Sequence, residues 1–415
     1  MKERTYGILS IPVIVGALGY FVDIYDLLLF GIIRKQSLAD LGLTGNQITT
    51  VGENILSIQM VGLLIGGIIW GVMGDKKGRL SVLFGSIILY SLANIANGMV
   101  TTTSQYMLVR FLAGIGLAGE LGAGITLVSE LLPKEKRGLG TSMVAGIGLT
   151  GAVVAFFISK EFNNWRLCYY IGGGLGFLLL ILRISVFESG MFNQMKKMNV
   201  VRGNFFMFFT DSERFKKYIQ SILLGLPTWY VIGVLVTFSA EFGTALGIKE
   251  NIDPGKAIMF AYAGISIGDV TIGFVSQWLK SRKKALFIFY CITALFMILF
   301  FTPINSSGIQ MYIICAGLGF GTGFWAIFVT MAAEQFGTNL RATAATTVPN
   351  MVRGALPLII YMYRWLRTVS HNQLLGGIVT GIIVMAIAIW AAINSRETFG
   401  KDLNYIESEE LSPAV

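Results

Sequence analysis

Long apolar runs alternate with short polar connections along the whole chain. Each run holds about 20 residues or slightly more, the length that an α-helix needs to cross the roughly 30 Å hydrocarbon core of a bilayer. The pattern predicts an all-α membrane protein with twelve transmembrane helices, at residues 8–33, 49–73, 79–100, 104–131, 140–160, 166–186, 218–242, 256–278, 283–302, 309–330, 342–364 and 373–393.

An internal repeat divides these helices into two sets of six. Residues 187–217 form the one long polar connection. The Glu130 to Arg137 spacing recurs at Glu334 to Arg341, and the turn after the second span has a counterpart ending the eighth, both at an offset of about 202 to 204. We predict an N-terminal bundle at 1–186, a cytoplasmic linker at 187–217 and a C-terminal bundle with a cytoplasmic tail at 218–415.

Composition supports a membrane protein and excludes an ordinary soluble domain. Hydrophobic residues make up 54% of the chain and charged residues only 13%. Most of the 32 Lys and Arg fall in loops that would be cytoplasmic if both termini were inside. Because this bias and anionic lipids account for the net charge of +9, we expect contact with membrane lipids and no nucleic-acid partner. We predict a bacterial inner-membrane protein that works as a monomer.

The chain offers no pattern for a cofactor or a metal. Cys168, Cys291 and Cys315 lie in or beside predicted spans without disulfide or metal spacing, and His371 is the single histidine. No phosphate-binding loop and no nucleophile beside a histidine is present, so we expect no enzyme. The first apolar run is too long for a cleaved signal peptide.

Charged residues inside the N-terminal spans are candidate functional sites, because ionisable groups are costly in hydrocarbon. Asp23 and Asp26 lie three residues apart on one helical face, while Arg110 and Glu120 lie in the fourth span. Asp26 and Arg110 are expected at similar depth, so they could pair. Pairing favours an ionised carboxylate and desolvation a protonated one, which suits proton coupling. A permanent packing pair is the alternative.

Arg353 is the candidate for binding a substrate anion. It lies between Pro349 and Pro357, which loosen the eleventh span, and a guanidinium can donate two parallel hydrogen bonds to a carboxylate. The alternative is an internal partner such as Asp269 or Glu53. The further candidate substrate contacts, for which plain packing is the alternative, are Asn350, Tyr25, Trp229, Tyr230, Tyr262, Trp325 and Asp269.

The turn after the second span resembles the signature of the major facilitator superfamily, a glycine, an aspartate four residues on, a basic residue and then Gly-Arg. The similarity covers essentially the whole chain. It implies two six-helix bundles that rock about a central site, with helices 1, 4, 7 and 10 lining the cavity. It also implies a cytoplasmic gate whose charged residues form salt bridges. The gate residues are here Gly71, Asp75, Lys76, Gly78, Arg79, Glu130, Arg137, Gln277, Glu334 and Arg341.

Within that superfamily the chain is most similar to metabolite–proton symporters, with sugar porters second. Tyr25 to Gly31, Arg110-Phe111, Gly119-Glu120 and the stretch from Glu130 to Gly138 carry this likeness, while Gly190 stands where a proline is usual after the sixth span. Gln277 in place of an aspartate predicts a weaker charge network in the second half. We therefore predict proton-coupled uptake of a small polar metabolite, an organic anion.

Three alternative functions remain open. A sugar–proton symporter is the first. A proton-driven efflux antiporter is the second, although residues 145–154 lack the Gly-Pro motif typical of antiporters. The third is a membrane sensor without transport, against which the charged spans and the absence of a soluble signalling domain argue.

Overall fold

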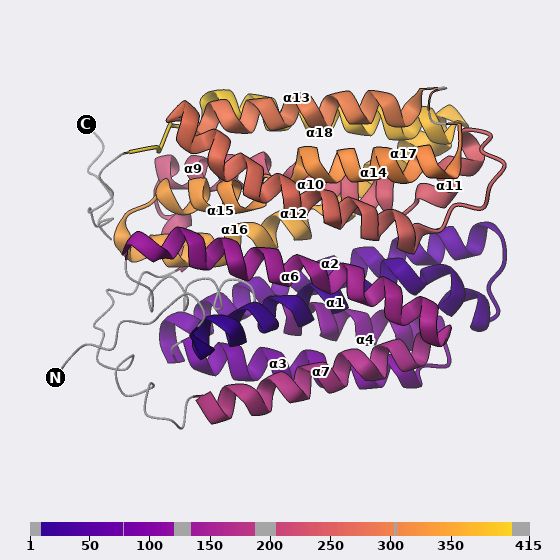
Figure 1. The fold of residues 1–415 in the computed structure, drawn as a ribbon, viewed down its shortest axis with the longest axis horizontal. Coiled ribbons are helices and arrows are strands. Elements are labelled where there is room, and N and C mark those ends of the chain that lie inside the picture. The colour runs from indigo at the N-terminus through magenta and orange to yellow at the C-terminus, as the bar shows by residue number, and fades with distance from the viewer. Residues whose placement is uncertain are drawn as a thin grey trace.

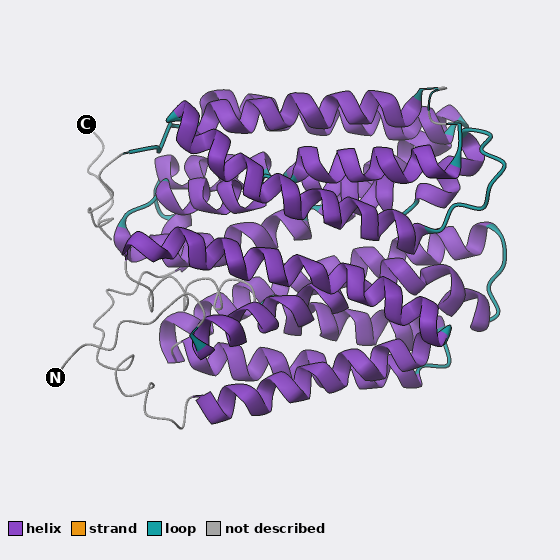
Figure 2. Ribbon diagram, viewed as in Figure 1, coloured by secondary structure: helices purple, strands orange, loops and turns teal. Residues whose placement is uncertain are grey.

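The structure is a computed structural model that describes residues 10–77, 79–119, 134–186, 205–302, 304 and 306–400. Of residues 74–77, 79–81 and 134–143 it describes the helix backbone alone. Over these described ranges the chain consists of helices and connecting loops, with no strand (Figure 2). The predicted all-α fold is therefore confirmed.

The helices lie in two layers that run along the long axis of the molecule (Figure 1). One layer is the N-terminal bundle, with α1 (Ile11–Asp40), α2 (Asn46–Lys77), α3 (Arg79–Met99), α4 (Thr103–Leu117), α6 (Lys134–Phe162) and α7 (Trp165–Val186). The other is the C-terminal bundle, with η2 (Phe205–Phe209), α9 (Ser212–Leu224), α10 (Leu226–Tyr230), η3 (Val231–Val236), α11 (Ser239–Ala245), α12 (Pro254–Leu279), α13 (Arg282–Phe301), α14 (Gly308–Thr322), α15 (Trp325–Glu334), α16 (Thr338–Gly354), α17 (Leu356–Ser370) and α18 (Gln373–Asn394).

Every predicted span coincides with at least one helix. In the described ranges 10 helical stretches are long and apolar enough to cross a membrane. The other two predicted spans are 104–131, whose described part ends at Gly119, and 342–364, which α16 and α17 cover with a break between them. The seventh span begins at Ser212, whereas its hydropathy predicted a start at residue 218. Hydropathy missed the first turns of this helix because they are polar and amphipathic.

Glycines bring equivalent helix pairs of the two bundles into close contact. A Cβ on Gly62 would lie 2.3 Å from the carbonyl oxygen of Phe111, where α2 crosses α4. A Cβ on Gly264 would lie 2.0 Å from the carbonyl oxygen of Ala316, where α12 crosses α14. Such small-residue crossings are typical of membrane helix packing. The two contacts are related by an offset of about 202 to 205, so the internal repeat extends to the packing of the helices.

Three helices of the C-terminal bundle are interrupted part-way along their length. The seventh span changes from α10 into the π-helical stretch η3 after Tyr230. The tenth span breaks at Gly323 between α14 and α15, and the eleventh breaks at Ala355 between α16 and α17. Pro357 begins α17, as expected for a loosened helix, whereas Pro349 remains inside α16. Interrupted helices free backbone groups and mark binding sites in transporters.

The two bundles touch along α2 and α16. A Cβ on Gly67 would lie 2.8 Å from the Cβ of Asn350, and one on Gly71 would lie 3.3 Å from Cγ2 of Thr347. Helix α2 therefore packs Gly67 and Gly71, four residues apart, against the opposite bundle and Gly62 against α4. This seam places the end of α16 beside the N-terminal bundle.

Candidate functional site

Arg353, at the end of α16, is the centre of the site. Its side chain is only 2% exposed, and its Nη2 lies 3.9 Å from Oδ2 of Asp23 on α1. Its Nη1 donates to Oδ1 of Asn350 at 3.5 Å, and its Nε makes no hydrogen bond to any described residue. A buried guanidinium at the boundary between the bundles thus keeps donors that a ligand could use.

The partner of Arg353 is therefore neither of the two that the sequence suggested. Glu53 binds Arg364 and Arg367 instead. Asp269 accepts the N–H of Ala326 at 3.0 Å and so caps the start of α15. A span that is apolar on all sides has no amphipathic pattern to show which face points inward. The contact between Arg353 and Asp23 could therefore not be predicted from the sequence.

Aromatic rings surround this guanidinium. The Cζ of Arg353 lies 5.8 Å from the ring centroid of Trp229 and 6.0 Å from that of Trp325. The two indole rings contact each other edge to face, with centroids 6.5 Å apart. Tyr262 of α12 is buried as well. Indole faces stabilise a nearby cation and offer flat apolar surfaces to a ring.

Two of the predicted substrate contacts do not belong to this cluster. The hydroxyl of Tyr25 donates to the carbonyl of Cys168 at 2.9 Å, on α7. The hydroxyl of Tyr230 donates to the carbonyl of Gly377 at 2.6 Å, on α18. Both rings therefore fasten neighbouring helices of one bundle, because a buried phenol needs a hydrogen-bond partner. Tyr20, which the sequence pattern did not single out, is buried on α1, three residues before Asp23.

Asn350 connects the two bundles beside Arg353. Its Nδ2 donates to the carbonyl of Ala118, just after α4, at 2.9 Å, and to the carbonyl of Thr346 at 3.2 Å. Because its Oδ1 faces Arg353, one amide joins the guanidinium to the backbone of the opposite bundle.

Asp26 and Arg110 form the predicted ion pair. Nη1 of Arg110 lies 3.0 Å from Oδ1 of Asp26, and both side chains are fully buried. The same arginine donates through Nη2 to the backbone carbonyl of Asp26 at 3.2 Å and through Nε to Oε1 of Gln59 at 3.3 Å. It also lies over the ring of Tyr169, with 5.5 Å between Cζ and the centroid. The pair is wholly inside the N-terminal bundle, on α1 and α4.

The two carboxylates of α1 thus have partners in different bundles. Asp26 faces Arg110 of its own bundle, and Asp23 faces Arg353 of the other. A family model described as Major Facilitator Superfamily matches residues 16–360, which include all four side chains.

This chain belongs to the Major Facilitator Superfamily. A metabolite transport protein of Haemophilus influenzae is 26% identical over 371 residues, which cover 85% of this chain and 87% of that protein. The niacin transporter of Acinetobacter baylyi is 24% identical in an alignment of 428 positions that covers 94% of each chain. The crystal structure of a D-xylose–proton symporter superposes with a TM-score of 0.69 at 16% identity, covering 94% of this chain and 99% of that one. This superfamily member is a multi-pass membrane transporter and not an enzyme.

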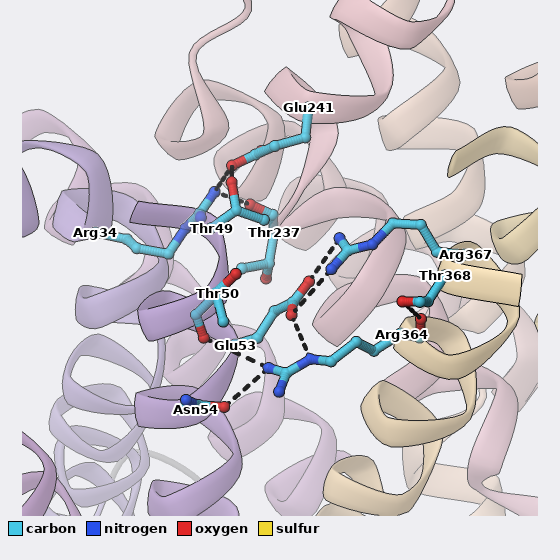
Figure 3. A network of polar contacts seen from close by, with 10 residues as sticks. All are labelled: Arg34, Thr49, Thr50, Glu53, Asn54, Thr237, Glu241, Arg364, Arg367 and Thr368. Carbon is cyan, nitrogen blue, oxygen red and sulfur yellow. Dashed lines mark hydrogen bonds and ion pairs between the residues drawn. The ribbon is translucent and has the colours of Figure 1, made fainter. Parts of the chain in front are cut away.

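Ion pairs join the two bundles of this major facilitator at the end predicted to face outside (Figure 3). Arg34 of α1 is fully buried and binds Glu241 of α11 at 2.7 Å. Glu53 of α2 is fully buried and binds Arg364 and Arg367 of α17 at 2.8 and 2.9 Å. The sequence-based prediction missed this network, although charges near the ends of apolar runs are a usable signal.

The predicted cytoplasmic gate is described only in part. Gly78 and Glu130 lie outside the described residues, and for Asp75, Lys76, Arg79 and Arg137 only the helix backbone is described. Glu120, the candidate proton-coupling residue of the fourth span, also lies outside the described residues. Glu334 binds Arg282 at 3.2 Å within the C-terminal bundle and accepts the hydroxyl of Thr398 at 2.6 Å. Gln277 is exposed, Arg341 is half-buried, and Gly71 packs against Thr347 across the seam.

Proposed function

We propose that this protein imports a small aromatic carboxylate together with protons by alternating access. The observation that carries the proposal is Arg353, a buried guanidinium at the boundary between the bundles, flanked by Trp229 and Trp325. A guanidinium matches a carboxylate in charge and shape, and two indole rings suit a planar apolar body. Both parts of such an anion would be bound within one cluster.

The relatives support this substrate class. The Acinetobacter baylyi relative, similar over nearly its whole length, is named for niacin, which carries one carboxylate on an aromatic ring. The interrupted seventh, tenth and eleventh spans supply Trp229, Trp325 and Arg353 to this cluster. Transporters use interrupted helices in this way for substrate sites near the bilayer midplane.

Asp23 would couple substrate binding to a proton. Asp23 is the carboxylate nearest to Arg353 in the described part of the chain, so an incoming carboxylate competes with it for one cation. A carboxylate that loses its cation in a buried place takes up a proton more readily. Binding of the anion and protonation of Asp23 would then favour each other.

Asp26 would be the second coupling site. Its pairing with Arg110 lies within one bundle, so the rocking of the bundles does not by itself separate the pair. Protonation of Asp26 would instead release Arg110, which then shifts toward Gln59 or Tyr169. Protonation of Asp26 would thus change the position of a side chain on α4.

We place the protein in the bacterial inner membrane, as a monomer with both termini in the cytoplasm, in accord with its loop charges. The ion-paired end in Figure 3 would then face outside, and its closure would leave access only from the cytoplasm. The cytoplasmic salt bridges predicted from the sequence would form when the external end opens.

Proton entry into proteoliposomes tests the proposal. Purified protein is reconstituted with an enclosed pH dye and challenged with nicotinate, nicotinamide, sugars and cationic drugs at fixed external pH. We expect acidification with nicotinate but not with nicotinamide, which has the same shape without the charge, and loss of the signal in Arg353→Gln. Acidification with sugars alone, or unchanged nicotinate uptake in Arg353→Gln, would refute the proposal.

A further inference from the structure

Arg364 and Arg367 hold Glu53 in the way that a protein binds a carboxylate ligand. Arg367 donates to both oxygens of Glu53, through Nη1 to Oε1 at 2.9 Å and through Nη2 to Oε2 at 3.4 Å. Arg364 adds a bond from its Nε to Oε2 at 2.8 Å. Two guanidiniums thus share one carboxylate, a bidentate geometry that recognises planar anions. We call Arg364 and Arg367 the outer fork.

The outer fork and its carboxylate belong to different bundles. Glu53 comes from α2, whereas both arginines come from α17 (Figure 3). The glutamate side chain is fully buried, but Arg364 and Arg367 are 32% and 22% exposed. When the bundles separate at this end, Glu53 leaves with the N-terminal bundle. Thr50 and Asn54, which accept hydrogen bonds from Nη2 of Arg364, are on α2 as well and leave with it, so the donors of the fork then face the opening.

Charge at this end favours an anion. Together with Arg34 and Glu241, the network holds three guanidiniums and two carboxylates. Glu241 is bound by Arg34 and Thr49 rather than by the fork. A positively charged entry raises the local concentration and the association rate of an anionic ligand.

The outer fork and Arg353 of the central site belong to the same interrupted span. Arg353 and Arg364 are 11 residues apart on the eleventh span, one at the end of α16 and the other in α17, on either side of the break at Ala355. Both reach residues of the N-terminal bundle, Asp23 and Glu53. The two halves of one span therefore carry an inner and an outer cation, and each cation contacts the N-terminal bundle.

We propose that Arg364 and Arg367 form an outer anion-binding station that receives the carboxylate of the substrate before it reaches Arg353. Glu53 is the built-in substitute that occupies the station when the external end is closed. This inference rests on the proposed function for the nature of the anion. It adds a second binding site and a reason why the external end closes after the substrate has moved inward.

Equilibrium binding of radiolabelled nicotinate to full-length purified protein tests the station. Every variant carries Arg353→Gln, so that the central site is silent. Adding Glu53→Gln removes the internal competitor. We expect the Kd for nicotinate to fall about tenfold or more relative to the protein with Arg353→Gln alone. Adding Arg364→Gln and Arg367→Gln to that protein should abolish saturable binding, and nicotinamide should not compete. Binding that survives loss of both fork arginines, or no saturable binding after Glu53→Gln, would overturn the inference.

Two control variants test whether the outer fork itself binds the anion. Glu241→Gln opens the other ion pair of the same end without freeing the fork. An equal fall in Kd there would show that Glu53 is only a latch, which contradicts the inference. Arg364→Lys with Arg367→Lys keeps both charges but not the paired N–H groups. It should weaken binding about tenfold if the fork recognises a carboxylate by shape.

Failure of this inference is distinguishable from failure of the proposed function. If wild-type protein takes up nicotinate in an Arg353-dependent manner while the fork variants bind as the Glu53→Gln protein does, only the outer station is wrong. If wild-type protein takes up no carboxylate, the proposed function is wrong, whatever the fork binds.

Discussion

Nη2 of Arg353 and Oδ2 of Asp23 face each other at 3.9 Å from opposite bundles. The separation leaves the attraction between the charges in place but is long for a hydrogen bond. A substrate carboxylate could thus take the donors of Arg353 without first breaking a short ion pair.

This relationship predicts different results for two similar substitutions on α1. Asp23→Asn removes the competitor of the substrate, so nicotinate should bind about tenfold tighter, a gain of about 1.4 kcal/mol. The pH dependence of binding should flatten as well. Asp26→Asn leaves Arg353 unchanged and should not tighten binding. Equal affinities in the two variants would contradict the assignment of Asp23.

Both substitutions should uncouple transport. Without a carboxylate to protonate, uphill accumulation of nicotinate should be lost while exchange across the membrane continues. Two measurements in proteoliposomes distinguish these activities: accumulation of nicotinate driven by a proton gradient, and counterflow exchange of nicotinate without a gradient. If accumulation survived Asp26→Asn, that residue would not be a coupling site.

The Asp26 and Arg110 pair should contribute strongly to stability. Removing one partner leaves the other charge buried, which typically costs about 3–5 kcal/mol. Arg110→Gln should therefore lower the melting temperature, and combining it with Asp26→Asn should cost less than the two effects added together. In a Cys291→Ser background, which removes the exposed thiol, a thiol-reactive dye that detects exposure of the buried Cys168 and Cys315 would report unfolding. Simple additivity would show that the pair does not interact.

Gly264 should tolerate no side chain. Its Cβ would overlap the carbonyl oxygen of Ala316 at 2.0 Å, and a backbone atom cannot move aside cheaply. Gly264→Ala should separate α12 from α14 and lower the melting temperature and the yield of folded protein. Gly273→Ala, on the same helix with nothing within 4 Å, is the matched control and should change neither. Equal stability of both variants would argue against this crossing.

Glu397 should make stability depend on pH below the neutral range. Burial alone would raise the pKa of Glu397, but hydrogen bonds from Ser281 and from N–H groups at the start of α13 outweigh it and hold the pKa below its usual value. A lowered folded pKa stabilises the protein above the unfolded pKa of about 4.5 and loses that effect as the pH falls through the folded value.

The comparison with Glu397→Gln isolates this effect from other acids. The wild type should exceed the variant in melting temperature at pH 6 and lose part of that advantage toward pH 3.5. A constant difference across this range would show that ionisation of Glu397 contributes nothing.

The sequence predicted the architecture well because the bilayer imposes one simple rule. A span must be apolar over its length, so the twelve helices are visible as twelve runs. Their division into two bundles followed from motifs such as Glu130 and Glu334 at a fixed offset. Charged residues inside the apolar runs were also recognisable as candidate functional residues, because a charge is costly in hydrocarbon whichever way it faces. Asp26 and Arg110 were predicted as a pair from their similar depth alone.

Pairing across the bundles could not be predicted in this way. For Arg353 the sequence offered Glu53 or Asp269 only as alternatives to a substrate anion. In the structure Glu53 binds Arg364 and Arg367, and Asp269 caps the start of α15. Likewise Tyr25 and Tyr230 were predicted to contact substrate but fasten helices. In an all-apolar span no amphipathic face distinguishes the interior from the lipid side.

The amino-acid sequence by itself thus determined the membrane-spanning helices, their repeat and the short set of charges worth considering. Only the tertiary structure decided that Asp23 faces Arg353, that Trp229 and Trp325 flank it, and that Glu53 lies in the outer fork. The physical reason is that depth in a bilayer depends on position along one helix, whereas a contact depends on the rotation and crossing of two.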